Sequence, residues 1–279
     1  MNILISAFLL LTLSLSVQAE RFRSSLHSVV ESPDGVLPHI LKLSNGRVAF
    51  IQGPETATLE LMASKKLRNR VFELEVDEKY RLLSLMNLDS SAANPEGPSA
   101  QTKALASYEP TVLANLTLAR SVFSLMRRDN QQDSQCYNRA HVWAYEEFTR
   151  SGLNSQKLFM FFTERYIWDY NFGWWFHVSP MVLVNEGDAV VQRVVDRLFT
   201  KAPRLIKTWT DIFIQSKRAC PVVAKYSDYE NHQQLEHCYL IPVSMYYWQP
   251  RDIDTFERTG YEKTQYVDWE VDHAYWEAF

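Results

Sequence analysis

The sequence predicts an α+β fold, in which a helix that begins at a cysteine packs on an antiparallel sheet and follows a small β-rich N-terminal unit. Short runs of Val, Ile, Leu and Phe between turn signals indicate strands. Apolar residues at helical spacing after Cys136 indicate a helix with one buried face. Aromatic residues make up 13% of the chain and only 8 residues are glycine, which is typical of a globular protein with large core side chains.

The N-terminal segment, residues 1–19, is predicted to be a signal peptide. Ile3 to Leu15 is an almost unbroken apolar run that is short for a membrane span, and Val17-Gln18-Ala19 places small residues at a cleavage site before Glu20. We therefore expect a secreted or periplasmic protein without stable membrane insertion; an uncleaved N-terminal anchor is the alternative. The net charge of −4 provides no basic surface for nucleic acid.

Residues 20–105 are predicted to form a separate β-rich unit, a small antiparallel sheet or barrel. Asn45-Gly46 lies between two apolar runs and predicts a tight hairpin. Ser, Asn, Pro and Gly collect in residues 90–105, which indicates a linker. The expected strands cover residues 36–43, 47–52, 56–63 and 71–76.

A second unit is predicted over residues 106–279. Apolar spacing indicates one helix before the cysteine helix and another after a strand hairpin that follows the cysteine helix. The remaining sequence, from about residue 217, is irregular and aromatic, with Trp248, Trp269 and Trp276 expected in a strap on the core or in a contact surface for substrate proteins. The expected elements are a helix at 112–126, strands at 157–162, 174–184 and 189–195, and a helix at 203–216.

The central helix begins at Cys136, with Asp133 or Ser134 as the predicted N-cap and Gly152 at its end. A thiol at this position faces the positive end of the helix dipole, which favours the nucleophilic thiolate. The alternative interpretation is a small buried apolar residue that happens to begin a helix.

The chain has three cysteines, so one is left over if two pair. A bridge between Cys220 and Cys238 would close a loop of about 19 residues and leave Cys136 as the free thiol. Three unpaired cysteines in a reducing compartment are the alternative, which the predicted signal peptide disfavours.

Two residues of the second unit could serve a nucleophilic cysteine. His177 lies within one predicted strand and Asp196 ends the next, and adjacent antiparallel strands can bring such side chains together. We expect His177 to act as the base for Cys136 and Asp196 to orient the imidazole. Read separately, His177 could be a core histidine and Asp196 a turn residue.

Three sequence blocks resemble the protein-glutaminase family over residues 110–215. The likeness implies a core similar to transglutaminases and, more distantly, to papain-like proteases. It also implies a secreted enzyme whose N-terminal pro-segment covers the active site, here residues 20–105. The sequence departs from the family in having Arg197 after Asp196 and in allowing at most one disulfide. The blocks are Ser134-Gln135-Cys136-Tyr137-Asn138-Arg139-Ala140-His141, Trp175-Phe176-His177-Val178, and Arg193-Val194-Val195-Asp196-Arg197-Leu198-Phe199 with Pro203 and Trp209.

The implied reaction is hydrolysis of a glutamine side-chain amide in a protein or peptide, with release of ammonia. The resemblance assigns Cys136 as nucleophile, His177 as base and Asp196 as the residue that orients the base, without metal or organic cofactor. The tetrahedral oxyanion is expected to bind the backbone N–H of Cys136 and a second donor. The candidates for that donor are Gln135, Trp174 and Trp175.

Other functions remain open at this point. The same triad could serve a transglutaminase or a cysteine peptidase, and an exported binding protein could retain the fold with an inactive site. His141 is expected to be a buried structural residue, and Arg139 to pair with an internal carboxylate. The spacing of His232, His237 and Cys238 matches no standard zinc pattern.

Overall fold

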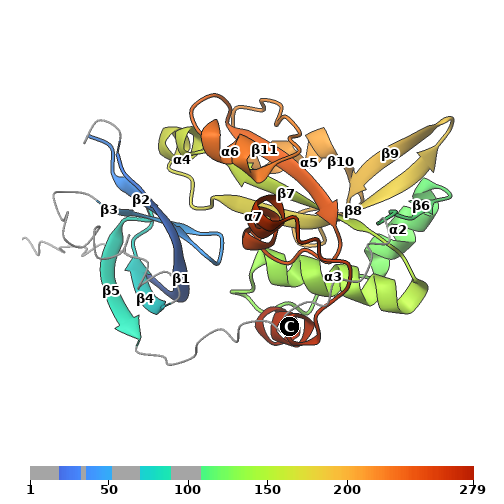
Figure 1. Cartoon of the computed structure of the whole chain (residues 1–279), viewed down its shortest axis with the longest axis horizontal. Coiled ribbons are helices and arrows are strands. Elements are labelled where there is room, and N and C mark those ends of the chain that lie inside the picture. The colour runs from blue at the N-terminus through green and yellow to red at the C-terminus, as the bar shows by residue number, and fades with distance from the viewer. Residues whose placement is uncertain (1–18, 33–35, 52–69, 89–107) are drawn as a thin grey trace, which may run out of the picture.

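The computed structural model describes residues 19–32, 36–51, 70–88 and 108–279. In these ranges the chain forms two antiparallel sheets, and helices surround the second one (Figure 1). The predicted combination of helices with antiparallel sheets is therefore confirmed. The predicted signal peptide up to residue 18, the strand at 56–63 and the linker at 90–105 lie outside the described residues.

The N-terminal sheet has five strands in the order β3-β2-β1-β4-β5, and all of its pairings are antiparallel. The predicted hairpin joins β2 to β3, and Gly46 adopts a φ of +87° in its turn, which a glycine accepts without steric cost. β1 and β5 were not predicted; β1 alternates polar with apolar residues too weakly to be recognised. The strands are β1 (Glu20–Val30), β2 (His39–Leu43), β3 (Val48–Ile51), β4 (Val71–Val76) and β5 (Leu82–Leu88).

The second sheet has the strand order β10-β9-β8-β7-β11, and a short strand, β6, pairs in parallel with β8. β7 and the first half of β8 are buried on both faces, since the molecule covers the sheet on each side. Three of these strands lie within two residues of their predicted bounds. The strands are β6 (Val112–Leu113), β7 (Gln156–Phe162), β8 (Phe176–Glu186), β9 (Ala189–Val194), β10 (Arg204–Leu205) and β11 (Cys238–Ser244).

Two predicted helices are shorter than expected because their first residues join the sheet. α2 (Leu116–Leu125) begins after Asn115, whose side chain accepts a hydrogen bond from the Leu118 N–H at 3.0 Å. The preceding residues form β6 instead of a first helical turn. α5 (Ile206–Phe213) likewise follows β10. Helical spacing of apolar residues does not reveal such short edge pairings.

The region after residue 217 is not irregular, and that prediction was wrong. It contains α6 (Tyr226–Asn231), β11, α7 (Pro250–Thr259) and α8 (Asp268–Ala278). These elements are short, and their many Tyr and Trp residues obscure the usual polar and apolar periods. Within the described ranges, no helix has both the length and the apolar character needed to cross a membrane.

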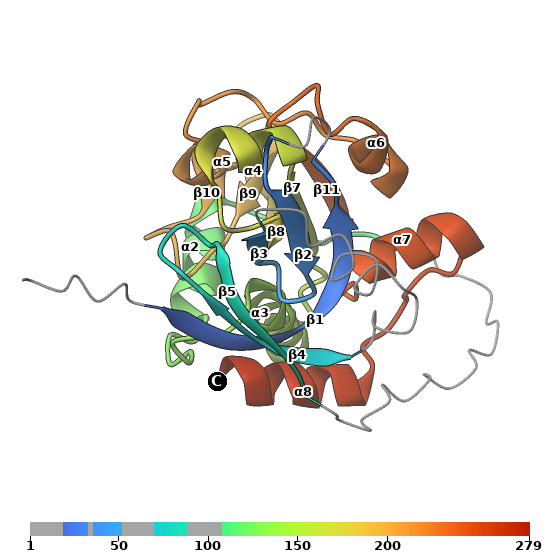
Figure 2. The same ribbon diagram turned by 90° about the vertical axis from the view of Figure 1, so that its left-hand side faces the viewer.

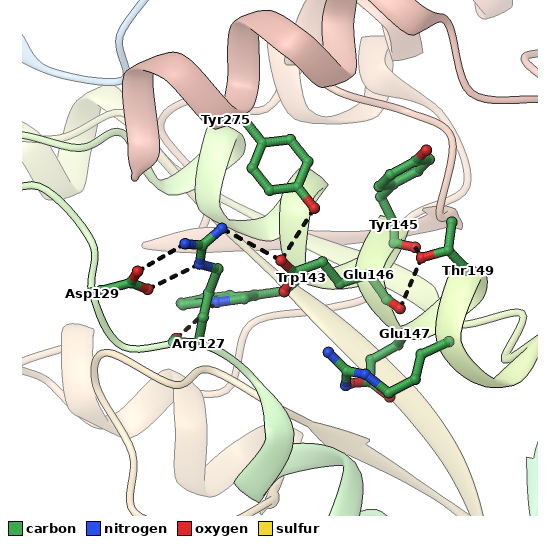
Figure 3. Close-up of polar contacts among 9 residues, drawn as sticks. Arg127, Asp129, Trp143, Tyr145, Glu146, Glu147, Thr149 and Tyr275 are labelled. Carbon is green, nitrogen blue, oxygen red and sulfur yellow. Dashed lines mark hydrogen bonds and ion pairs between the residues drawn. The ribbon is translucent and has the colours of Figure 1, made fainter.

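The cysteine helix, α3 (Cys136–Ser151), contacts α8, which lies across it (Figures 1 and 2). Glu146 on α3 accepts hydrogen bonds from the Tyr275 hydroxyl at 3.1 Å and from the Arg127 guanidinium at 3.4 Å (Figure 3). Arg127 also pairs with Asp129, and its backbone carbonyl accepts the indole N–H of Trp143 at 3.2 Å. The C-terminal helix thereby fixes the helix whose first residue is Cys136.

The apolar core is continuous between the two sheets. Ile40, Val48 and Phe50 of the N-terminal sheet belong to the same buried cluster as Phe159 and Phe176 of the second sheet. Figure 2 shows the N-terminal sheet lying in front of the second sheet and α3. The N-terminal sheet is therefore docked on the second one through buried side chains.

The disulfide between Cys220 and Cys238 is present, with a Cα–Cα distance of 5.0 Å, and Cys136 is a free thiol. The bridge ties the loop before α6 to β11. We predict that Cys220→Ser lowers the free energy of unfolding by about 3 kcal/mol, because the unfolded chain regains the freedom of this loop. Urea titration would measure the change. An equal midpoint for the variant and the oxidised wild type would contradict the prediction.

Candidate functional site

α3 begins without a side-chain cap. Gln135 occupies the N-cap position with extended backbone angles, and its side chain makes no capping hydrogen bond. The prediction of Asp133 or Ser134 as the cap was therefore wrong, since Ser134 instead accepts hydrogen bonds from Arg139. The N–H groups of the first turn, beginning at Cys136, stay available to a ligand at the positive end of the helix.

His177 and Asp196 form a buried pair on the neighbouring sheet. His177 lies in β8 and Asp196 follows the end of β9, and both side chains are at most 2% exposed. The Nε2 atom of His177 is 2.7 Å from Oδ2 of Asp196. The same carboxylate oxygen accepts the indole N–H of Trp209 at 2.9 Å. The pairing that the sequence suggested for these two residues is thus present in the structure.

Cys136 shares a cavity with His177. The cavity has a volume of about 130 Å³ and lies between the start of α3 and the start of β8. The Cys136 thiol beside the imidazole contributes to the raised pKa of His177. Because Asp196 occupies Nε2, the nitrogen left for the sulfur is Nδ1, which makes no hydrogen bond to any described residue.

The electrostatic setting favours a protonated imidazole. Burial lowers the pKa of His177, but the Asp196 carboxylate and the adjacent Cys136 outweigh it and raise the pKa to about 9. Burial likewise raises the pKa of Asp196, while the charge of His177 and the hydrogen bonds from His177 and Trp209 hold it below its usual value. The pair is therefore ionised at neutral pH.

Aromatic rings surround the His177 imidazole on several sides. The Phe213 ring centroid lies 4.6 Å from that of His177, and the Trp174 ring stacks at 5.8 Å. Phe199 and Trp209 contact the imidazole at 5.1 and 5.6 Å. Trp209 falls within the helix predicted at 203–216, but its hydrogen bond to Asp196 could not be predicted, because no local sequence pattern reveals such a contact.

Arg139 is buried and lines the cavity with Cys136. The predicted pairing with a carboxylate is not seen among the described residues, where the guanidinium hydrogen-bonds to Ser134, at 2.9 Å to its hydroxyl. Burial lowers the pKa of Arg139, while the charges of Cys136 and Asp196 raise it. Arg139 thus adds a positive charge near the thiol.

The remaining histidines lie apart from this cavity. His141 is buried as predicted, and its Nδ1 atom is 2.7 Å from Nζ of Lys157. His232 contacts the carbonyl of Asp228, and His237 contacts the hydroxyl of Ser216 at 2.8 Å. Cys238 is in the disulfide and offers no thiolate to a metal.

The three candidates for a second oxyanion donor differ in what they contact. The Gln135 amide donates to the carbonyl of Asp133 at 2.9 Å, and the Trp175 indole donates to the carbonyl of Leu43 at 2.7 Å. Trp174 lines the cavity beside His177. Two of the three donor groups are therefore already engaged, which leaves Trp174 as the strongest candidate.

The β2–β3 turn of the N-terminal sheet covers the cavity, and Asn45, Gly46 and Arg47 form part of its wall. The turn is held by backbone hydrogen bonds, from the Trp175 N–H to the Gly46 carbonyl and from the Val48 N–H to the Gly173 carbonyl, both 2.9 Å long. A Cβ atom on Gly46 would lie 3.1 Å from the Phe176 ring, so the turn approaches β8 closely.

Comparison with known proteins finds likenesses to protein-glutaminases. Residues 118–213 match the family model described as glutaminase. The crystal structure of a mutant of pro-protein-glutaminase shares the fold, with a TM-score of 0.51, 11% identity, and coverage of 83% of this chain and 85% of that one. Comparison with curated proteins gave no match.

Two further solved structures are similar to this chain. The crystal structure of pro-protein-glutaminase is 12% identical with a TM-score of 0.48, and the match covers 83% of this chain and 84% of that one. The protein-glutaminase of Chryseobacterium proteolyticum, solved by NMR, is 12% identical with a TM-score of 0.35, over 53% of this chain and 90% of that one.

The ionised pair predicts a pH-dependent stability. The pKa of His177 is raised on folding, so the stabilisation is complete below the ordinary pKa of 6.5 and is lost as the pH rises through about 9. We expect the free energy of unfolding to fall over this window by at most about 1.4 kcal/mol per pH unit. Asp196→Asn should flatten the dependence, as measured by urea titration from pH 6 to 9.5. An unchanged slope in the variant would argue against this pair as its source.

Proposed function

We propose that this protein is a secreted protein-glutamine deamidase that uses Cys136 as nucleophile, His177 as acid and base, and Asp196 as the orienting carboxylate, in a transglutaminase-like catalytic unit over residues 106–279. The single observation that carries the proposal is the buried 2.7 Å contact between His177 and Asp196 beside the free thiol of Cys136. The glutaminase family match over this part of the chain agrees with the substrate amide.

The first chemical step is attack of sulfur on the glutamine side chain. In the proposed reactive form Cys136 is a thiolate beside the protonated imidazole of His177, because the thiolate is the nucleophile. The thiolate adds to the carboxamide carbon, and the amide nitrogen then leaves as ammonia with the proton from Nδ1 of His177. A thioester joins the glutamyl carbonyl to Cys136, and the imidazole is left neutral.

The second step releases glutamate. A water molecule gives its proton to His177 Nδ1 and attacks the thioester carbonyl, and the carbon–sulfur bond breaks to return the thiolate–imidazolium pair. In both steps the oxyanion lies near the uncapped N–H groups at the start of α3, with the Trp174 indole as the second donor. Asp196 keeps the imidazole in the orientation that places Nδ1 toward sulfur.

The N-terminal sheet is proposed to inhibit the enzyme until it is displaced. The β2–β3 turn fills the approach to Cys136 and binds the backbone of residues 173–175. Buried contacts strengthen this docking, including the Lys42 ammonium at 3.2 Å from the Glu164 carboxylate. The similarity in fold to the mutant of pro-protein-glutaminase agrees with a role of residues 20–105 as a pro-region.

The nucleophile is tested by ammonia release from a glutamine-containing protein such as casein. Cys136→Ser should lower kcat/KM by a factor on the order of 10³ or more, because the remaining hydroxyl is a poor nucleophile. Ser124→Ala on the exposed face of α2 is the matched control and should retain activity within about twofold. Equal ammonia release by wild type and Cys136→Ser would exclude the proposed mechanism.

The same assay separates the alternative reactions. A transglutaminase would incorporate an added primary amine and cross-link the substrate, and a cysteine peptidase would shorten it on a denaturing gel. A deamidase raises the mass of the substrate by about 1 Da per glutamine without either change. Folded protein that yields no ammonia, before and after removal of the N-terminal sheet, would favour the non-catalytic binding protein.

Inhibition is tested by cutting the folded chain. A specific protease site placed within residues 90–105 allows cleavage after folding, while wild-type chain treated with the same protease is the control. After cleavage the N-terminal sheet and residues 106–279 are separate fragments. They dissociate at nanomolar protein concentration, because the linker no longer keeps their effective concentration high. We expect ammonia release to rise by roughly tenfold or more on dilution. Activity that is high in the uncut chain and unchanged by cleavage would refute the inhibitory role.

A further inference from the structure

A second cavity, of about 310 Å³, adjoins the cavity at Cys136. Trp174 and Phe199 line both cavities, so the two lie side by side with these rings between them. The described residues that form the walls of the second cavity are mostly aromatic, and none of them carries a charged side chain. Its lining consists of Tyr80, Phe172, Gly173, Trp174, Phe199, Ile212, Phe213 and Gln215.

We propose that this second cavity is a subsite for an aromatic or large apolar side chain that flanks the reactive glutamine in the substrate protein. The inference rests on the proposed deamidase function and adds a rule of substrate choice to it. An apolar cavity of roughly 150 Å³ can already hold a benzene molecule, so the volume suffices for a phenyl or indole ring.

An aromatic side chain of the N-terminal sheet already contacts this cavity. Tyr80, from the turn between β4 and β5, places its ring against Gly173. A Cβ atom on Gly173 would lie 2.4 Å from that ring, so a side chain there would displace it. An aromatic side chain of the N-terminal sheet thus occupies the space that the missing side chain at residue 173 leaves open.

The backbone of Tyr80 is held in an unusual conformation for this contact. Its φ of 59° lies in the left-handed region, which costs energy for a residue other than glycine. The buried Asp77 carboxylate holds the turn by accepting hydrogen bonds from the N–H groups of Lys79 and Arg81, both at 2.9 Å. Strain of this kind is expected where a side chain must reach a defined position.

The backbone beside the cavity pairs with the N-terminal sheet as one strand pairs with another. The Gly173 carbonyl and the Trp175 N–H hydrogen-bond to the β2–β3 hairpin, and Arg47 lies opposite Trp174 in antiparallel register. When the N-terminal sheet departs, these two groups become free to pair with another extended segment. A substrate strand on this path passes Cys136 and continues toward the second cavity. β3 now takes this course, and its Phe50 N–H hydrogen-bonds to the carbonyl of Tyr80, which lines that cavity, at 2.8 Å.

The proposal is tested with the chain that is cleaved within residues 90–105 after folding. The substrates are short peptides with one glutamine in a glycine background, with Phe placed in turn at each of the two positions on either side. Each has a matched Ala peptide. We expect kcat/KM for ammonia release to be roughly tenfold or more higher for Phe than for Ala at one of these positions, because the cavity removes the ring from water.

Substitutions at the cavity wall connect this preference to the structure. Ile212, which is 45% exposed, contributes to the wall, and Ile212→Glu should reduce the ratio of Phe to Ala kcat/KM at least fivefold by placing a charge beside the ring. Gln215→Glu is a second variant with the same expectation, since among the described residues Gln215 hydrogen-bonds through its backbone N–H, to Tyr166, and not through its side chain. Val190→Glu, on an exposed residue of β9, is the control and should keep the wild-type ratio.

The outcomes separate the subsite from the proposed function. Ammonia release at rates that are equal within twofold for Phe and Ala at every position would overturn the subsite and leave the deamidase intact. A preference for Phe that persists in both wall variants would also overturn it, because the ring would then bind elsewhere. Absence of ammonia from all peptides and from casein would refute the deamidase and the subsite together.

Discussion

The buried contact between His177 and Asp196 is the interaction on which the rest of the site depends. A carboxylate without water is costly unless its oxygens are hydrogen-bonded, and Asp196 accepts from the imidazole and from the Trp209 indole. These groups come from β8, the end of β9 and α5, so the pair forms only when all three elements are in place. The pair in turn fixes which imidazole nitrogen faces Cys136.

The N-terminal sheet is part of the same arrangement. Its hairpin pairs with the backbone of residues 173–175, and Tyr80 contacts the adjoining aromatic cavity. The contacts that close the site in this structure therefore lie along the route proposed for a substrate segment. Inhibition and substrate choice would then depend on the same few backbone groups and rings, because one surface can bind only one of the two segments at a time.

Local sequence patterns predicted much of the scaffold. The β2–β3 hairpin followed from Asn45-Gly46, and β7, β8 and β9 followed from apolar runs within two residues of their bounds. The free Cys136 and the bridged Cys220 and Cys238 also followed from counting and spacing. The elements after residue 217 did not, because each is short and stabilised mainly by contacts with distant parts of the chain.

The sequence by itself determined the residue types and their order along the chain: a free thiol at a helix start, an imidazole within a strand and a carboxylate after the next strand. Turn chemistry and apolar spacing are local properties, and these features are encoded over a few residues. Only the tertiary structure decided that Trp209 bonds to Asp196, that Gln135 leaves the helix uncapped, and that Tyr80 faces Gly173. Each of these depends on how separate elements pack together, which no short stretch of sequence specifies.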